Sequence, residues 1–401
     1  MGEDAYNSLS QPPGLPTAAP LMNLILGVDA IVPPLTGIGH YALHLARGLR
    51  CRTDIADLRY FAGWRWLADP EQALAANQVL AVAQRRIPFK SLAFKLYQLA
   101  RDAAFRWQSR SLHGYLFHAP NYILPTFADP GIATIHDLSH LRYPQFHPRE
   151  RIAYLERRLP DTLRRAGGLI SDSAFIRQEI ITLLGVAPHR IHVVPLGVDP
   201  VFHPRSAVEI QPVLDRYRLA GVPYLLVVAT LEPRKNLART VAAYARLPAA
   251  LRQQYPLALA GAPGWLSEDL ERAIAPLERI GQARRLGYIP QDDLPMIYAG
   301  AFAFAYPSLY EGFGLPVLEA LASGIPTLIS DRASLPEVAG DAALYVDPED
   351  VDDLSAGLER LLSDDAWRAT AVAAGLQQAG RFSWERCIDQ TVAAYRAALD
   401  A

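Results

Sequence analysis

The chain has 401 residues, of which 51% are hydrophobic and 20% are charged, and its formal net charge is −2. At roughly 150 residues per domain, these values predict a globular protein of two or three domains and exclude a disordered, collagen-like or coiled-coil chain. Two cysteines, Cys51 and Cys387, are too few for a disulfide framework or a cysteine-rich zinc site, which fits a reducing compartment.

The two halves of the chain differ in charge. Residues 1–200 carry 21 Lys and Arg against 16 Asp and Glu, whereas residues 201–401 carry 18 against 25. This difference indicates a domain boundary near residue 200. Neither half is basic enough for a nucleic-acid-binding protein, and no run of about 18 apolar residues predicts a membrane-spanning helix.

The first half predicts one parallel α/β domain after a disordered extension. Residues 1–21 have no basic region at their start, so they do not resemble a signal peptide. From residue 22 onward, short apolar runs alternate with amphipathic helical stretches, as in sheets covered on both faces. The clearest predicted strands are LILGVDAIV, 131–138, 167–173 and 190–199. We therefore expect the first domain to span residues 22–203.

The second half repeats this pattern and predicts a second doubly wound domain over residues 204–380. Its predicted strands are 224–230, 256–261, 284–289, 301–308, 326–330 and 342–347. Asn236 is expected to cap the helix over 236–247. Residues 381–401 are expected to form a helix that crosses back to the first domain. Because ligands of such sheets bind at the carboxyl ends of the strands, the chemistry is expected in a cleft between the domains.

The strongest motif is AYPSLYEGFGLPVLEALASG, in which a buried strand is followed by a glycine-containing loop and a helix. Glu311 and Glu319 lie eight residues apart across this turn and can face one ligand from two sides. The glycines allow close approach of the backbone, and the helix start after Gly314 offers N–H groups to an anion. The alternative interpretation is a loop cap at Glu311 and a solvated helix residue at Glu319.

The segment EGFGLPVLE resembles the Glu-x7-Glu motif of retaining GT-B glycosyltransferases, specifically glycosyltransferase family 4. Further segments over residues 23–395 are similar to the same family, although 1–21 lies outside the resemblance and 60–112 matches no pattern. They are LVVATLEPRKN, RRLGYIPQDDLPMIYAGA, ASGIPTLIS, SLPEVAGDAALYVDPED, TGIGHY, TIHDLSHLRYP, SDSAFIRQEI and RIHVVPLGVD. The resemblance implies two Rossmann-like domains that face a central cleft.

The resemblance also implies roles for the second-half residues. Arg234 and Lys235, placed just after a strand, would stabilise the departing nucleoside diphosphate and make a bound metal ion unnecessary. Glu311 would bind hydroxyl groups of the donor sugar, and Glu319 those of the ribose. Gly314 and Leu315 would offer backbone N–H groups to the donor. Tyr288 and Ile289, at a predicted strand end, would frame the nucleobase, although core packing explains them equally well.

In the first half, the Gly-rich turn TGIGHY places Gly37 and Gly39 near the cleft, where they would contact the donor; a plain tight turn is the alternative. The turn lacks the third glycine of the dinucleotide fingerprint, which disfavours a dehydrogenase. By resemblance, His136 would contact the donor sugar, with Asp137 beside it on the acceptor side. His118 is a further acceptor-side candidate. No histidine spacing supports a metal site.

The resemblance favours a hexosyltransferase that uses GDP-mannose as its only co-substrate, without a further cofactor, because the TLEPRKN and HDLSHLRYP segments are most similar to bacterial mannosyltransferases of polysaccharide assembly. GDP-rhamnose and a UDP-hexose stay open as donors. The expected acceptor is a lipid-linked or growing glycan, as in O-antigen synthesis. A catalytically silent protein that binds sugar nucleotides or acts as a membrane scaffold is the rival from another class.

Residues 85–110 contain seven Lys and Arg, one acid and interleaved large apolar side chains. This pattern indicates either a basic amphipathic helix at an anionic membrane surface or a solvated helix packed on the first domain. The expected location is the cytoplasm. If the basic helix binds lipid, the protein would lie at the inner face of the cytoplasmic membrane.

Overall fold

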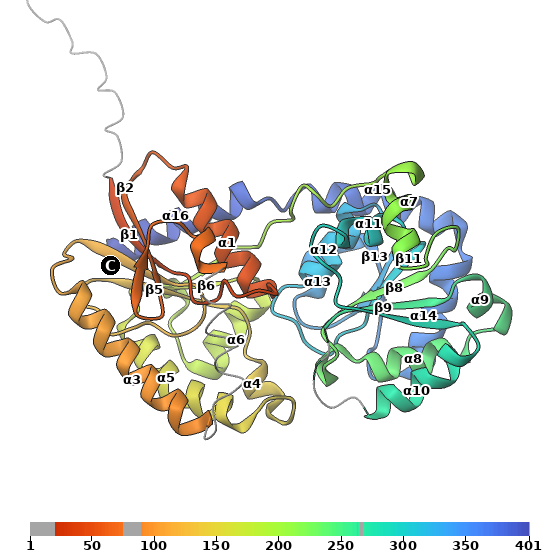
Figure 1. Cartoon of the computed structure of the whole chain (residues 1–401), viewed down its shortest axis with the longest axis horizontal. Helices are drawn as coiled ribbons and strands as arrows, with labels where there is room; N and C mark the ends of the chain where they lie inside the picture. Colours follow the sequence, from red (N-terminus) through yellow and green to blue (C-terminus); the bar gives the residue numbers. More distant parts are fainter. Residues whose placement is uncertain (1–20, 75–89, 263, 265–267, 401) are drawn as a thin grey trace, which may run out of the picture.

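The computed structural model describes residues 21–74, 90–262, 264 and 268–400, which form two α/β domains side by side (Figure 1). The extension predicted over 1–21 falls almost wholly outside the described residues. The first domain contains a seven-stranded sheet in the order β3-β2-β1-β4-β5-β6-β7, parallel except for β3. Its strands are β1 (Met22–Gly27), β2 (Ile55–Ala62), β3 (Arg65–Leu67), β4 (Tyr115–Ala119), β5 (Gly131–Ile135), β6 (Gly168–Ser171) and β7 (Ile191–Val193).

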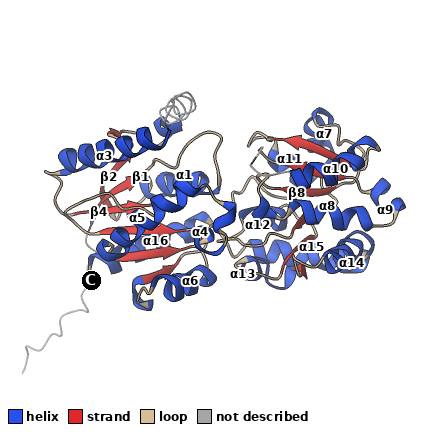
Figure 2. Cartoon of the chain, turned by 90° about the horizontal axis from the view of Figure 1, so that it is seen from below, coloured by secondary structure: helices blue, strands red, loops and turns tan. Residues whose placement is uncertain are grey.

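Helices cover both faces of this sheet (Figure 2). The helices of the first domain are α1 (Gly37–Arg50), α3 (Lys90–Ser109), α4 (Ser139–Arg142), η1 (Pro144–Phe146), α5 (Arg149–Arg165), α6 (Ala174–Leu184) and η2 (Pro188–Arg190). Helix α6 shows how the sequence sets the ends: the Ser173 side chain accepts from the Ile176 N–H, and Gly185 ends the helix with φ of 67°.

The second domain contains six parallel strands in the order β10-β9-β8-β11-β12-β13. Its strands are β8 (Leu225–Val228), β9 (Leu257–Ala260), β10 (Ala283–Gly287), β11 (Ala303–Tyr306), β12 (Thr327–Ser330) and β13 (Ala343–Val346). Its helices are α7 (Ala207–Arg216), η3 (Pro233–Lys235), α8 (Leu237–Arg246), α9 (Ala249–Gln254), α10 (Glu268–Arg279), α11 (Leu294–Ala299), α12 (Leu315–Ala322), α13 (Leu335–Ala339), η4 (Gly340–Ala342), α14 (Val351–Ser363) and α15 (Asp365–Ala379).

Continuous apolar strands make these sheets the centre of each domain. All residues of β9, β11 and β12 are buried, as are those of β4, β5 and β6 in the first domain. Such strands are typical of parallel sheets covered on both faces. The doubly wound two-domain fold predicted from the sequence is confirmed.

The chain crosses between the domains twice, and the two crossings lie side by side. In the first crossing, Val198 donates its N–H to the Phe382 carbonyl of the second crossing and forms a bridge with Ser383. Helix α16 (Trp384–Leu399) then packs on α1 in the first domain. A side chain at Gly48 in α1 would place its Cβ only 1.9 Å from the Ile388 side chain, so this packing is tight. The final helix therefore completes the core of the first domain.

Within the described part of the chain, no helix combines the length and the apolar character needed to cross a membrane. One local expectation was wrong. The helix over 237–246 begins after Asn236, but the Asn236 side chain does not cap it. Its Oδ1 atom accepts from the Arg239 guanidinium at 3.1 Å, and its NH2 group donates to the carbonyls of Pro307 and Pro348, which ties the start of α8 to the loops after β11 and β13.

Candidate functional site

Two loops at the carboxyl ends of neighbouring strands meet in the second domain. Arg234 and Lys235 lie in η3, after β8, whereas Glu311 lies in the loop after β11. The Arg234 carbonyl accepts hydrogen bonds from the Leu309 N–H and the Ser308 hydroxyl, at 2.9 and 3.1 Å. The adjacency of β8 and β11 thus brings together residues that are 76 positions apart in the sequence.

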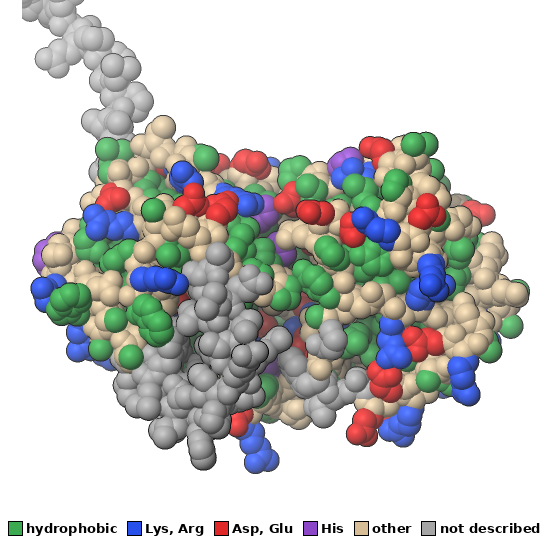
Figure 3. All heavy atoms as spheres, viewed as in Figure 1, with side chains coloured by type: hydrophobic (Ala, Val, Ile, Leu, Met, Phe, Trp, Pro, Cys, Tyr) green, Lys and Arg blue, Asp and Glu red, His purple; other side chains and the backbone are tan. Residues whose placement is uncertain are grey.

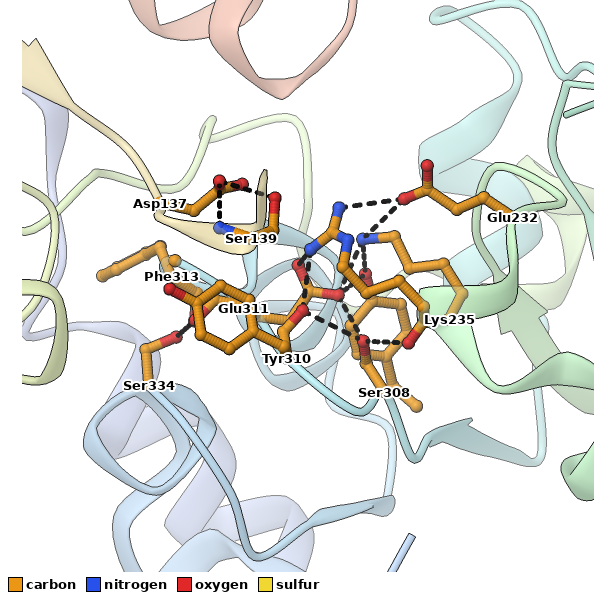
Figure 4. A network of polar contacts seen from close by, with 12 residues as sticks. Asp137, Ser139, Glu232, Lys235, Ser308, Tyr310, Glu311, Phe313 and Ser334 are labelled. Carbon is orange, nitrogen blue, oxygen red and sulfur yellow. Dashed lines mark hydrogen bonds and ion pairs between the residues drawn. The ribbon is translucent and has the colours of Figure 1, made fainter. Parts of the chain in front are cut away.

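Glu311 is buried at the centre of a polar network (Figure 4). Its Oε1 atom accepts from Lys235 Nζ at 2.7 Å, from the Ser308 hydroxyl at 2.7 Å and from the Tyr306 hydroxyl at 3.0 Å. Its Oε2 atom lies 3.2 Å from Arg234 Nη1. This many donors orient a carboxylate firmly and leave Oε2 with one partner, so that atom can accept a further hydroxyl group.

The charges in this network stabilise one another. Burial raises the pKa of Glu311, but Lys235 and Arg234 lower it more, so the net pKa lies below the usual value. Burial and the neighbouring Arg234 lower the pKa of Lys235, against the opposing effect of Glu311. Glu232 adds a second carboxylate, 2.9 Å from Arg234 Nη2. Two cations and two carboxylates therefore lie together where the loops after β8 and β11 meet.

The first domain contributes His136 and Asp137, which directly follow β5 and face the Glu311 loop of the second domain. Asp137 Oδ1 accepts from the Tyr122 hydroxyl and from the N–H and hydroxyl of Ser139, at 3.1, 3.0 and 2.8 Å. Burial raises the pKa of Asp137, but the Arg234 charge and the two hydrogen bonds from Ser139 bring it well below its usual range. Figure 4 shows Asp137 and Ser139 beside the network formed by the second domain.

Both ring nitrogens of His136 have partners. Nδ1 lies 2.6 Å from Asp172 Oδ2, and Nε2 lies 2.8 Å from the Pro120 carbonyl. A carbonyl only accepts, so Nε2 carries a hydrogen and donates it. Burial lowers the pKa of His136, but Asp172 raises it above the usual value overall. Contact between this ring and a sugar therefore requires exchange of the Pro120 hydrogen bond.

The prediction that His118 lies on an acceptor surface was wrong. His118 is fully buried, and its ring nitrogens contact the Tyr395 hydroxyl of α16 at 2.7 Å and the Thr134 hydroxyl at 2.8 Å. Burial lowers the pKa of this ring to about 3, so it is neutral. His118 thus joins α16 to the first sheet.

The three glycines predicted to line the cleft, Gly37, Gly39 and Gly314, lie in different environments. Gly37 begins α1 and is exposed, and a Cβ there would lie 3.7 Å from the Leu315 side chain in the second domain. Gly39 packs against the Ala30 carbonyl, where a Cβ would lie at 3.0 Å. Gly314 is the residue before α12, with φ of 114°, and Leu315 is its first residue. The starts of α1 and α12 therefore face each other across the domain boundary.

Hydrogen bonds made by Ser173, Gly312 and Glu337 also join the two domains. The Glu337 carboxylate accepts the N–H groups of Ala174 and Phe175, the first two residues of α6, at 2.8 and 2.6 Å. A carboxylate at a helix N-terminus is favoured by the helix dipole. The Ser173 hydroxyl donates to the Gly312 carbonyl at 2.8 Å. The structure therefore represents the domains in mutual contact.

Sequence comparison assigns the family. Residues 35–202 match Glycosyltransferase Family 4, and residues 218–378 match Glycosyl transferases group 1. The chain is also 41% identical over 382 residues to O-antigen chain mannosyltransferase B of Escherichia coli, covering 94% of this chain and 100% of that relative. The chain belongs to glycosyltransferase family 4.

Solved structures show that this glycosyltransferase has the GT-B fold. Sucrose-phosphate synthase from Thermosynechococcus elongatus superimposes with a TM-score of 0.71 and 23% identity, covering 94% of this chain and 98% of that one. HepE from Anabaena, solved with UDP-glucose, gives a TM-score of 0.71 and 18% identity over 93% and 99% of the two chains. The fold predicted from the resemblance is confirmed.

Glu319 of the glycosyltransferase lies on α12, in a different environment from Glu311. Burial, with Asp199 nearby, raises the pKa of Glu319 to about 8. Tyr288 and Ile289 follow β10 rather than end it, because Gly287 adopts φ of 71°. The Tyr288 side chain is 48% exposed, whereas Ile289 is in the core. Of this pair, only Tyr288 presents a side chain to solvent.

The raised pKa of Glu319 predicts a pH-dependent stability. An acid that is harder to ionise in the folded state favours folding at low pH, and this contribution is lost as pH rises from the unfolded pKa, 4.5, to about 8. A Glu319→Gln variant lacks the carboxyl group, so its Tm should rise relative to the parent over this interval. Thermal unfolding at pH 5 and pH 8.5 measures this difference, and an unchanged gap between the two proteins contradicts the raised pKa.

Several residues of the site were missed by the sequence analysis. Glu232, Tyr306 and Ser308 stand inside motifs that were noticed, TLEPRKN and AYPS, but nothing in their spacing showed which of them face Glu311. Ser334 fixes the same loop by donating to the carbonyls of Glu311 and Phe313, both at 2.9 Å. In the described part of the glycosyltransferase, no group of three or more His, Cys, Asp and Glu side chains could hold a metal ion.

Proposed function

We propose that the glycosyltransferase transfers mannose from GDP-mannose to a hydroxyl group of a lipid-linked or growing polysaccharide, with retention of configuration and without a metal ion. Similarity to an O-antigen chain mannosyltransferase along the whole length of that relative supports the sugar and the acceptor class. The single observation that carries the chemistry is the contact of Glu311 with both Arg234 and Lys235.

Arg234 and Lys235 stabilise the leaving group in this proposal. Negative charge grows on the diphosphate as the bond to the sugar breaks, and preorganised cations stabilise it most where water is excluded. Both side chains are largely buried, with 13% and 11% of their surface exposed. They supply positive charge at the proposed diphosphate site, so the proposal assigns no step to a metal ion.

Glu311 positions the donor sugar. The network holds its carboxylate ionised, so Oε2 accepts hydrogen bonds from sugar hydroxyl groups near the carbon that reacts. Glycosyl transfer passes through an oxocarbenium-like transition state, which this negative charge also favours. The acceptor hydroxyl attacks on the face that the diphosphate leaves, and a departing phosphate oxygen takes its proton. The new bond then has the configuration of the old one.

A basic helix supports an acceptor at a membrane surface. In α3, Phe105 is buried in the domain core, whereas Trp107 is 64% exposed and lies 5.0 Å from the Arg110 guanidinium. Exposed Trp and Arg side chains on a helix suit an anionic interface. Of the basic segment predicted over 85–110, residues 85–89 and the side chains of residues 90–99 lie outside what the structure describes. We propose a cytoplasmic enzyme that contacts the inner face of the cytoplasmic membrane.

Thermal unfolding with nucleotides tests the donor. GDP and GDP-mannose, at 100 times their Kd, should stabilise the protein by about 2.7 kcal/mol and raise Tm by roughly a few degrees. UDP and UDP-glucose are the matched controls and should have little effect. Stabilisation by UDP species alone contradicts the donor, and GDP-mannose binding without any product on a glycan acceptor favours a silent binding protein. The anomeric configuration of the product, measured by NMR, tests retention.

A further inference from the structure

One side chain of the Glu311 loop is buried in the core of the other domain. Tyr310 directly precedes Glu311, yet it is 3% exposed and packs in the hydrophobic core of the first domain. Its ring meets those of Tyr143 and Phe175 edge-on, with 5.8 Å between the centroids in each pair. Figure 4 shows the Tyr310 ring on the side of the network where Asp137 lies. The second domain therefore inserts a side chain into the first, one residue from the carboxylate assigned to the donor sugar.

Two groups of the first domain hold the Tyr310 hydroxyl. It accepts the backbone N–H of Leu138 at 3.0 Å, and it donates to Oε2 of Glu179. Leu138 directly follows Asp137, whereas Glu179 lies on α6 and is 4% exposed. Burial, with Asp137 and Glu179 nearby, raises the pKa of Tyr310 far above its usual value. The hydroxyl therefore keeps its proton and makes both hydrogen bonds.

The backbone of Tyr310 is held by the second domain. Arg234 Nη1 donates to the Tyr310 carbonyl at 2.7 Å, and the same atom lies 3.2 Å from Glu311 Oε2. Tyr310 thus joins the cation assigned to the diphosphate with the loop of the first domain that carries Asp137. The mechanism proposed above makes no use of the Tyr310 side chain.

The polar contacts of Tyr310 fix a direction as well as filling space. A buried hydroxyl or carboxylate costs free energy unless it is hydrogen-bonded, and a phenyl ring could fill the same space without that cost. Glu179 has a second partner, since its Oε1 atom accepts from Arg142 Nε at 2.6 Å, and the Arg142 side chain is about half exposed. Buried polar groups that are all satisfied favour one geometry over other packed arrangements.

We propose that Tyr310 is a positioning residue, which fixes Glu311 relative to the first-domain loop that carries Asp137. A displacement of about 1 Å between reacting groups can cost about 10²-fold in rate. Tyr310 acts through Glu311 and does not touch the sugar. This inference rests on the proposed transferase function and adds a residue that sets the geometry of transfer.

Kinetics of Tyr310→Phe test the proposal. The variant keeps the ring but loses both hydrogen bonds of the hydroxyl, so kcat for mannose transfer should fall about 10–10²-fold. The KM for GDP-mannose and the Kd for GDP should stay near the parental values, because Arg234 and Lys235 keep their places. Tyr143→Phe is the matched control: it deletes a hydroxyl from the same aromatic cluster, one that has no hydrogen-bond partner among the described residues. It should keep the parental kcat.

Substitutions of Glu179 test whether the hydroxyl acts through this carboxylate. Glu179→Gln keeps an oxygen that accepts from Tyr310 and should retain most of the kcat. Glu179→Leu offers no acceptor and should lose as much as Tyr310→Phe. The two losses should not add in the double variant, as expected for residues in one hydrogen-bond network. Equal losses in Glu179→Gln and Glu179→Leu, or full additivity in the double variant, contradict this path.

A purely structural role for Tyr310 gives a different result. The Tm of Tyr310→Phe then falls, but kcat measured well below Tm equals that of the parent. A loss of GDP affinity as large as the loss of kcat also overturns the proposal, because it places the effect on nucleotide binding. Failure of the proposed function is distinguishable: a parent that transfers no mannose from GDP-mannose contradicts both, whereas an active parent equalled by Tyr310→Phe contradicts this inference alone.

Discussion

Replacing Lys235 with alanine should lower kcat by about 10²–10³-fold while the protein stays folded. Lys235 Nζ lies 2.7 Å from Glu311 and 2.8 Å from the Tyr306 hydroxyl, at the place assigned to the leaving diphosphate. Its removal withdraws one of two cations from the charge that develops as the sugar bond breaks. Glu311 keeps Arg234, Ser308 and Tyr306 as partners, so the buried carboxylate stays compensated.

Steady-state kinetics with GDP-mannose, together with circular dichroism and Tm, measure the effect of the Lys235 substitution. Arg246→Ala is a suitable control, since it removes a cation from the surface of α8 whose ion-pair partner among the described residues is the exposed Asp352. The control should keep parental activity. Near-parental turnover in Lys235→Ala, with the fold intact, contradicts the assignment of the diphosphate site.

Replacing Gly312 with alanine should lower activity by about 10²-fold or more by keeping the domains apart. The new Cβ would lie 1.8 Å from the His136 carbonyl oxygen and 3.2 Å from the Asp137 Cβ, both in the other domain. The neighbouring atom at 1.8 Å is backbone, so it cannot turn aside as a side chain can. The domains must separate, which breaks the Ser173 bond to the Gly312 carbonyl and moves Asp137 away from Arg234.

Activity and small-angle X-ray scattering together test the Gly312 substitution. We expect a larger radius of gyration and a loss of transfer of about 10²-fold or more. Binding of GDP should be retained, because Arg234 and Lys235, to which we assign the diphosphate, both lie in the second domain. Gly380→Ala is the control, because a Cβ there meets its nearest atom at 3.5 Å, an ordinary contact. A compact, active Gly312→Ala protein would show that this approach of the domains is not needed for catalysis.

The sequence predicted the fold correctly where the local residue pattern and the tertiary packing favour the same structure. The apolar runs that became β8, β11 and β12 were readable because buried parallel strands carry a continuous apolar signal. The Glu311 loop was readable because glycines, a helix start and two carboxylates stand close together in the chain.

Contacts between residues that are far apart in the sequence explain most of the features that could not be predicted. His118 looked available to a ligand because sequence gives no sign that Tyr395, 277 residues later, occupies its Nδ1 atom. The partners of Arg234 in the loop after β11 follow from strand order, which local patterns do not contain. Asn236 has the residue type of a helix cap, but its Oδ1 atom accepts from the Arg239 guanidinium at 3.1 Å, and its NH2 group is held by the carbonyls of two distant prolines. The strand β3 is too short, at three residues, to give a periodic signal.

The return of α16 to the first domain has a consequence for synthesis of the protein. The first sheet is complete in sequence by β7, yet its His118 lacks the Tyr395 hydroxyl, and the α1 surface at Gly48 lacks Ile388, until α16 is made. On the ribosome, the first domain therefore cannot complete its core until α16 has been made. The second domain, whose strands and helices all precede α16, can fold first. We therefore expect the second domain to fold before the first during synthesis, against the usual order.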